Sequence, residues 1–179
     1  MGSVTAACPL CMTEGSSTRV MNDLYRITCA VCGEYDITGS IEASLGRDGI
    51  YEGKRAALSA LARRATEQGA RLFLVSSEMD QILAGAPGPR IPTDVIDDVL
   101  LRLADRTHAY GVAARLPATD YAVFFLTDRA QLSGVVQLMA DLHLVKVMPT
   151  DVRSDGSPTR AASAAITSPS PARWWQKCS

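Results

Sequence analysis

Two closely spaced cysteine pairs near the start of the chain carry the clearest chemistry in the sequence. The pairs are Cys8 with Cys11 in CPLC and Cys29 with Cys32 in CAVC, and seventeen residues separate them. Thiolates bind Zn2+ strongly, and turns of this kind supply two of the four ligands of a tetrahedral site. A separation of about 15 to 20 residues between two such pairs is typical of a zinc site. We therefore expect the four cysteines to hold one Zn2+ ion.

Redox activity is the alternative chemistry for a C-x2-C pair. A thioredoxin-like site needs one such pair beside a strand-helix-strand pattern, whereas this chain has two pairs that match each other. Four thiolates also fill the coordination sphere of the metal and leave no open position to activate water. We therefore expect a structural ion, and we interpret Cys178, the fifth cysteine, as a spare thiol.

The residues around the two pairs predict a small zinc ribbon over residues 1–40. Strand-favouring residues at 17–20 and 25–28 flank a turn signal at Asn22-Asp23, and residues 34–38 alternate like a third strand. Gly33 follows the second pair directly, where such a turn often needs a positive φ. A ribbon of about forty residues buries too little apolar surface to fold alone. The metal would then supply most of its stability, on the order of 10 kcal/mol.

Helical periodicity replaces the strand pattern over residues 41–85, which we interpret as a helical connector. The main helix is predicted over residues 53–68 and ends at Gly69, and a second helix is predicted over 76–83. The apolar positions of the main helix, which we expect to face inward, are Ala57, Leu58, Leu61 and Ala65. The sequence GAPGP at 85–89 cannot continue a helix and is the best candidate for a boundary.

The same connector carries a local excess of basic residues in a chain whose net charge is −1. Phosphate binding usually shows as such an excess, so nucleic acid is a candidate ligand here. The alternative is an ordinary solvated helix surface, because helices routinely carry such runs. The candidate phosphate contacts are Lys54, Arg55, Arg63 and Arg64.

Residues 90–179 predict a winged-helix-like domain. Their order is helix, strand, two helices, strand, loop, strand and closing helix, with the recognition helix at 128–142 and the tip of the wing at 150–159. Arg129 and Gln131 are the candidate base contacts, and Arg153 is the candidate contact on the wing. An ordinary mixed helical domain is the alternative. Because the outward side of the recognition helix has one basic residue, it favours a protein partner as much as DNA.

Composition excludes several other classes of protein. The sequence is 47% apolar, enough for a buried core, and has neither an apolar run long enough to cross a membrane nor a signal-peptide pattern. We therefore expect a protein of the reducing cytoplasm without a membrane partner. Neither histidine belongs to a recognisable catalytic motif, and phosphate-binding and zinc-protease motifs are absent. We expect no enzyme and no small-molecule substrate.

The order of motifs along the chain resembles that of a group of bacterial proteins. The motifs are CPLC…YRITCAVCGEYDITG, then RAALSALARR, a Pro-broken segment and a winged-helix-like half. This order is similar to the zinc-ribbon plus winged-helix regulatory modules at the N-terminus of some bacterial proteins, including effectors of phage defence. In such relatives a separate effector domain can follow the closing helix. The resemblance implies that any catalytic part is absent here or lies on another polypeptide.

The sequence thus predicts an α+β protein with a four-cysteine zinc ribbon, a helical connector and a winged-helix-like domain. The predicted function is that of a non-enzymatic, zinc-stabilised recognition or regulatory module that binds nucleic acid. The alternative is a protein-interaction adaptor or sensor module in bacterial antiviral defence.

The paired spacing of the cysteines generates a first prediction about metal content. We expect purified, reduced protein to carry about one zinc per chain, and we expect Cys29→Ser to lose the metal and unfold the ribbon, because the remaining three thiolates cannot close the site. Elemental analysis together with circular dichroism measures both effects. Freshly prepared reduced protein that is folded and free of metal would contradict the prediction.

Overall fold

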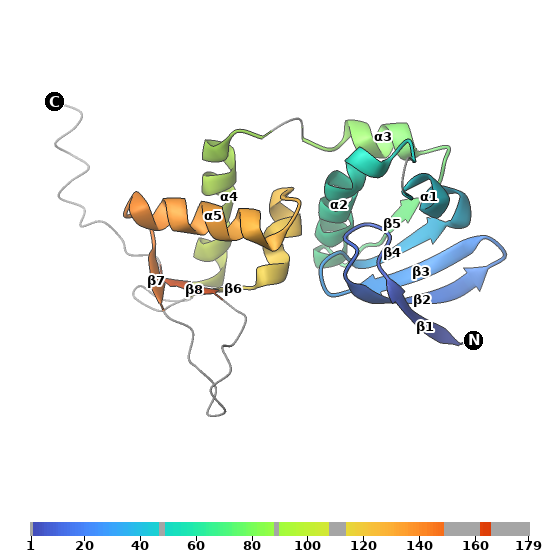
Figure 1. Cartoon of the computed structure of the whole chain (residues 1–179), viewed down its shortest axis with the longest axis horizontal. Coiled ribbons are helices and arrows are strands. Elements are labelled where there is room, and N and C mark those ends of the chain that lie inside the picture. Colours follow the sequence, from blue (N-terminus) through green and yellow to red (C-terminus); the bar gives the residue numbers. More distant parts are fainter. Residues whose placement is uncertain (1, 47–48, 88–89, 108–113, 149–161, 166–179) are drawn as a thin grey trace. The chain divides into compact units, whose positions relative to one another are not determined.

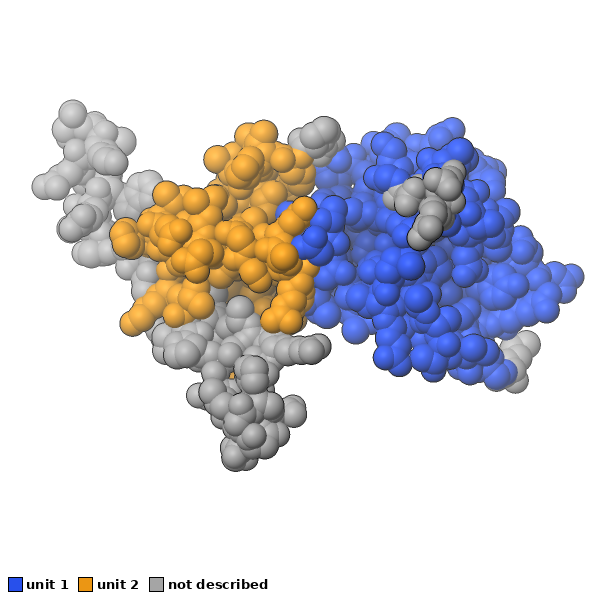
Figure 2. All heavy atoms as spheres, viewed as in Figure 1, with its two compact units in different colours: residues 1–89, 119–128 blue, residues 90–118, 129–179 orange. Residues whose placement is uncertain are grey.

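A computed structural model describes residues 2–46, 49–87, 90–107, 114–148 and 162–165 of this α+β chain. The chain divides into two compact units, which are coloured separately in Figure 2. The first unit consists of Met1–Pro89 and Thr119–Asp128, and the second consists of Arg90–Ala118 and Arg129–Ser179. Residues 119–128 therefore belong with the cysteine-rich part of the chain, although their neighbours in sequence belong to the second unit.

A five-stranded sheet forms the body of the first unit (Figure 1). Both cysteine pairs lie at turns of this sheet. The strands are β1 (Ser3–Ala7), β2 (Glu14–Met21), β3 (Leu24–Cys29), β4 (Gly33–Thr38) and β5 (Leu72–Leu74), and they lie in that order across the sheet. Neighbours pair antiparallel, except that β5 runs parallel to β4. The three predicted strands are confirmed as β2, β3 and β4, whereas β1 and β5 were not predicted.

The two faces of this sheet differ in polarity because side chains alternate along each strand. Ile27, Tyr35 and Leu72 lie opposite one another on β3, β4 and β5 and contribute to the apolar face, where Tyr35 is fully buried. On the other face Arg26 bonds to Asp36 directly across the strands, with 2.9 Å from Nε to Oδ1. Apolar side chains therefore gather on the face that the helices cover.

Three helices and a 3-10 turn follow β4 in the first unit. They are α1 (Gly39–Ser44), η1 (Glu52–Lys54), α2 (Arg55–Glu67) and α3 (Met79–Ala84). Helix α2 packs against β4 and β5 and links these parallel strands. Residues 41–85, predicted as a connector, thus contribute a strand and a packed helix to the same unit as the cysteines.

The buried side of α2 differs from the predicted one. The buried residues are Leu58, Ser59, Ala60 and Ala62, whereas Ala57, Leu61 and Ala65 are only partly buried. Apolar periodicity missed Ser59 because a polar residue counts against a core position. Its hydroxyl faces the cysteine cluster, 3.1 Å from the sulfur of Cys32.

The second unit combines two long helices with a three-stranded sheet. Its elements are α4 (Pro92–Arg106), β6 (Ala114–Leu116), α5 (Arg129–Asp141), β7 (Lys146–Met148) and β8 (Ala162–Ala165). The strands lie in the order β6-β8-β7 with antiparallel pairing. The predicted wing tip at 150–159 and the closing helix at 171–177 lie outside the described residues. Among the helices that the structure does describe, none is long and apolar enough to cross a membrane.

Helix α2 approaches the start of β4 closely at Gly33. The hydroxyl of Thr66 on α2 accepts a hydrogen bond from the backbone N–H of Glu34, with 2.9 Å between N and Oγ1. A Cβ on Gly33 would collide with the side chain of Thr66, and the φ of Gly33 is +78°. Both the close approach and the backbone conformation therefore require glycine.

Alanine substitutions at Gly33 and Gly69 distinguish the cost of the close contact from the cost of the backbone conformation. Gly69 has a similar φ of +74°, but a Cβ there would meet nothing within 4 Å. We expect Gly69→Ala to cost about 1–2 kcal/mol of unfolding free energy from the left-handed backbone alone. We expect Gly33→Ala to cost a further 1–3 kcal/mol, roughly, because Thr66 must move. Urea denaturation of both variants measures the difference, and equal costs would contradict the proposed contact.

Candidate metal centre

Two short turns at the same side of the sheet present the four cysteines. The first joins β1 to β2 and is closed by the N–H of Cys8 on the carbonyl of Thr13, at 2.7 Å. The second joins β3 to β4, and Cys29 is the last residue of β3. The residue after each pair has a positive φ, +61° at Met12 and +78° at Gly33. This confirms the expectation for Gly33 and shows that Met12 occupies the matching position in the first turn.

These turns bring all four sulfur atoms within 4.8 Å of one another. The cross-pair distances include 3.7 Å between Cys8 and Cys32 and 3.4 Å between Cys11 and Cys29, and all four residues are free thiols. A tetrahedral zinc site with Zn–S bonds of about 2.3 Å has sulfur–sulfur edges of about 3.8 Å. The arrangement is therefore compatible with a metal site. Cys8, Cys29 and Cys32 are buried, while Cys11 is partly exposed.

Each sulfur also has a hydrogen-bond partner outside the cysteine set. The hydroxyls of Tyr35, Ser59 and Thr13 lie 3.2, 3.1 and 2.9 Å from the sulfurs of Cys8, Cys32 and Cys11. The backbone N–H groups of Val31 and Cys32 point at the sulfur of Cys29, at 3.3 and 3.5 Å. Such outer donors stabilise thiolates and hold metal ligands in place.

Sequence reasoning did not identify these three hydroxyl residues. Thr13 and Tyr35 each lie only a few positions beyond a cysteine pair, so their closeness in sequence was an available signal. Ser59 lies twenty-seven residues from Cys32, and only the packing of α2 against β4 brings it to the cluster. No local pattern predicts a contact of that kind.

The four cysteine thiols differ in pKa. Hydrogen bonding, above all with Cys11, lowers the pKa of Cys8 to about 7 and holds the pKa of Cys29 well below its ordinary value. The pKa of Cys11 is raised, mainly through Cys29, and that of Cys32 is raised mainly through Cys11. The four thiols therefore do not ionise independently, and the cluster keeps part of its protons in the absence of a cation. A divalent cation can replace those remaining protons.

Comparisons with models of protein families, with curated proteins and with solved structures found no match for this chain. The assignment of the cysteine cluster therefore rests on the distances, burial and hydrogen bonds given above.

Three of the four predicted phosphate contacts of the first unit have intramolecular partners, and the fourth, Lys54, is exposed at the end of η1. Arg55 donates to the carbonyl of Leu45, with 2.8 Å from Nε. Arg63 bonds to Glu67 and to the carbonyl of Ala30, and Arg64 donates twice to the carbonyl of Val123. Phosphate binding by these arginines would therefore compete with contacts that hold the first unit together.

The predicted base contacts lie at the start of α5 in the second unit. Arg129 and Gln131 are exposed there, whereas Arg153 lies outside the described residues. Arg129 borders a hollow of about 200 Å³ beside α5. The remaining lining residues are mostly apolar: Leu116, Ala118, Leu132, Ser133, Val136, Gln137 and Val147.

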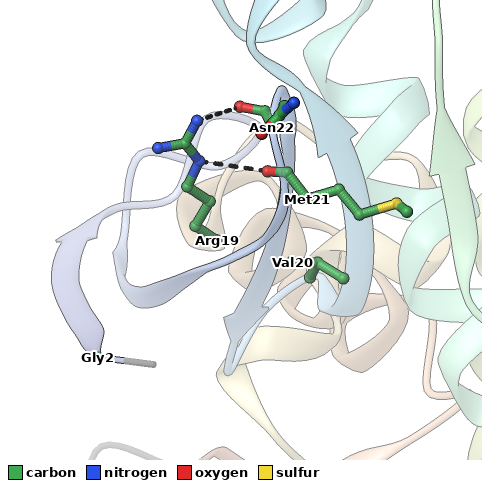
Figure 3. A pocket seen from close by; sticks show the side chains of 5 residues that line it. All are labelled: Gly2, Arg19, Val20, Met21 and Asn22. Atoms are coloured by element: carbon green, nitrogen blue, oxygen red, sulfur yellow. Dashed lines mark hydrogen bonds between the residues drawn. The ribbon is translucent and has the colours of Figure 1, made fainter.

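Another hollow, of about 300 Å³, lies at the β2–β3 turn of the first unit (Figure 3). It is lined by Gly2, Arg19, Val20, Met21 and Asn22. The guanidinium of Arg19 donates to the carbonyls of Met21 and Asn22, at 3.3 and 2.6 Å. Arg19 therefore braces its own turn, and we assign no ligand to this hollow.

Competition between protons and metal at the cysteines generates a prediction about pH. Because the thiolate is the form that binds metal, we expect the affinity for Zn2+ to fall as the pH falls and bound Zn2+ to be released in acid. The hydroxyl of Tyr35 helps to lower the pKa of Cys8, so we expect Tyr35→Phe to lose its metal at a higher pH than the wild type. A zinc-sensitive dye measures release during acid titration.

Tyr25→Phe is the matched control for this titration. Tyr25 lies opposite Ile37, near the end of β3 remote from Cys29, and we expect its loss to leave the release curve unchanged. A release curve for Tyr35→Phe that coincides with those of the wild type and of Tyr25→Phe would contradict the role given to the Tyr35 hydroxyl.

Proposed function

We propose that this protein is a non-enzymatic recognition module whose first unit is a zinc-ribbon-like fold stabilised by structural Zn2+. The observation that carries the proposal is the set of four cysteine sulfurs within 4.8 Å of one another. Four thiolates close a tetrahedral shell, so the ion stabilises the fold and has no open position for water. The outer hydrogen bonds of Tyr35 and Ser59 support this assignment, because they hold ligands in fixed positions.

We further propose that the second unit is winged-helix-like, with α5 as its recognition helix. The order of α4, β6, α5, β7 and β8 supports this, as does the antiparallel pairing of β7 with β8. Strand β6 adds to the outer side of β8 and completes a small sheet beside that hairpin.

A protein partner is the ligand that the contacts favour. Three of the four predicted phosphate-binding residues on η1 and α2 are engaged within the first unit. Helix α5 instead presents Leu138 with 41% of its surface exposed, and Leu142 follows the helix with 55% exposed. Together with the apolar hollow beside α5, these side chains fit apolar groups better than phosphates.

Nucleic acid is the second candidate, because Lys54, Arg129 and Gln131 are exposed. The positive charges of Lys54 and Arg129 attract phosphates, and Gln131 can hydrogen-bond to base edges. A place in bacterial antiviral defence, which the sequence resemblance implies, stays a prediction.

The protein-partner proposal predicts that the exposed apolar surface of α5 is needed for binding. We expect Leu138→Glu to lose partner proteins that the wild type retains after crosslinking in cell extract, since a charge there cannot be buried against an apolar surface. Leu101→Glu is the matched control, because Leu101 is a 65% exposed leucine on α4 of the same unit. Quantitative mass spectrometry of the captured proteins compares the three chains.

Titration with duplex and single-stranded DNA at low salt decides between the two ligand classes. We expect no salt-dependent binding. Binding that weakens steeply with salt, with a slope that flattens by about one unit per contact in Arg63→Ala and Arg64→Ala, would favour nucleic acid instead. In that case Arg129→Ala should reduce sequence preference.

A further inference from the structure

One guanidinium group, that of Arg63, joins three parts of the first unit. Its Nε donates to Glu67 one turn later on α2, at 3.1 Å. One terminal nitrogen donates to the carbonyl of Ala30, at 3.2 Å, inside the second cysteine turn. The other lies 3.9 Å from a carboxylate oxygen of Asp120, a residue with 0% exposure. Arg63 thus connects the cysteine turn to the segment 119–128.

A single peptide group links Arg63 to the cysteine cluster. The peptide between Ala30 and Val31 directs its N–H at the sulfur of Cys29, at 3.3 Å, and its carbonyl at Arg63. A planar trans peptide holds its N–H and C=O in opposite directions. Any change that turns the N–H away from the Cys29 sulfur must therefore also turn the carbonyl away from Arg63.

The segment 119–128 is seated in the first unit by apolar burial and by two arginines. Its 3-10 turn η2 (Ala118–Phe124) contains Tyr121 and Phe124, both buried. Arg64 donates to the carbonyl of Val123 and lies over the ring of Phe125, with 4.6 Å from Cζ to the ring centroid. Phe125 has a φ of +60°, a conformation that a bulky residue adopts only when its surroundings hold it.

The cysteine cluster and this segment also interact electrostatically. Burial raises the pKa of Tyr121, and its Coulombic interaction with the four cysteines raises it further. Tyr121 therefore keeps its proton in the docked segment. The buried carboxylate of Asp120 is tolerated because a guanidinium is placed against it, since an isolated buried charge is strongly unfavourable.

We propose that metal binding at the four cysteines controls the docking of residues 119–128, with Arg63 as the positioning residue. This inference rests on the proposed structural metal. With metal bound, Cys29 is held as a thiolate, the Ala30 carbonyl is fixed, and Arg63 is anchored beside Asp120. Without metal, the turn loosens, Arg63 loses one of its anchors, and burial of Asp120 becomes unfavourable enough to release the segment.

The segment is continuous in sequence with β6 before it and α5 after it, both elements of the second unit. Loss of the metal would therefore release a segment that leads directly into α5, the helix that we propose to contact a partner. The first unit would act as a metal sensor for the second.

Hydrogen exchange of the full-length, zinc-loaded chain tests the relay. The N–H groups of Phe125 and Leu126 are bonded to Ala122 and Tyr121, at 2.9 and 3.1 Å, so peptides covering this segment should exchange slowly. In Arg63→Gln we expect them to exchange about tenfold faster or more while zinc content stays unchanged. Arg71→Gln is the matched control, because Arg71 pairs with Glu34 on β4, and should leave them unchanged.

Metal affinity gives an independent readout. If metal binding favours docking of residues 119–128, docking must favour metal binding to the same extent. We expect Arg63→Gln to weaken Zn2+ binding about tenfold in competition with a chelator, as outer-shell substitutions typically do, and Arg71→Gln to leave it unchanged. Asp120→Asn removes the buried charge but keeps the shape of the side chain. We therefore expect residues 119–128 to stay protected in this variant even when zinc is removed, and this measurement serves if Arg63→Gln does not fold.

The possible outcomes separate the two proposals. A wild-type chain that binds no Zn2+ overturns the structural metal, and the relay with it. Zinc-loaded Arg63→Gln with a fully protected 119–128 segment overturns the relay alone, and so does an Asp120→Asn chain that releases the segment on zinc removal as readily as the wild type. Removal of zinc from the wild type with protection of that segment retained has the same consequence.

Discussion

Mutual repulsion among four converging sulfur atoms is the constraint on which the first unit depends. With all four within 4.8 Å of one another and three of them buried, they cannot all be thiolates unless a cation lies among them. Hydroxyl and backbone donors around the cluster favour the thiolate form. The cluster is therefore compatible with a divalent metal ion. Such an ion would hold together the turn between β1 and β2 and the turn between β3 and β4.

Helix α2 makes this centre part of a larger structure. Ser59, Arg63 and Thr66 lie at helical spacing along it, and they contact the Cys32 sulfur, the Ala30 carbonyl and the Glu34 backbone respectively. One side of a single helix thus touches both sides of the second cysteine turn. The same helix precedes β5, which pairs with β4, so the cysteine turns, the sheet and the helix form one packed unit.

Local patterns account for what the sequence predicted. The cysteine spacing and the glycine after the second pair depend on residues close together in the chain, and both expectations agree with the structure. Strand β5 is only three residues long and pairs with a strand more than thirty residues earlier, so no local signal marks it. In sequence, Arg63 and Arg64 look like part of a solvated basic helix face. Their structural role is visible only from their distant partners, which are Ala30, Asp120 and Val123. Long-range contacts of this kind are invisible to periodicity.

X-ray absorption at the zinc edge tests the central claim most directly, because it reports the atoms bound to the ion. On reduced protein purified without added chelator, the account predicts a single shell of four sulfur ligands at about 2.3 Å and no oxygen or nitrogen ligand. A shell that contains water oxygen or histidine nitrogen, or a folded protein with no zinc signal, would contradict it.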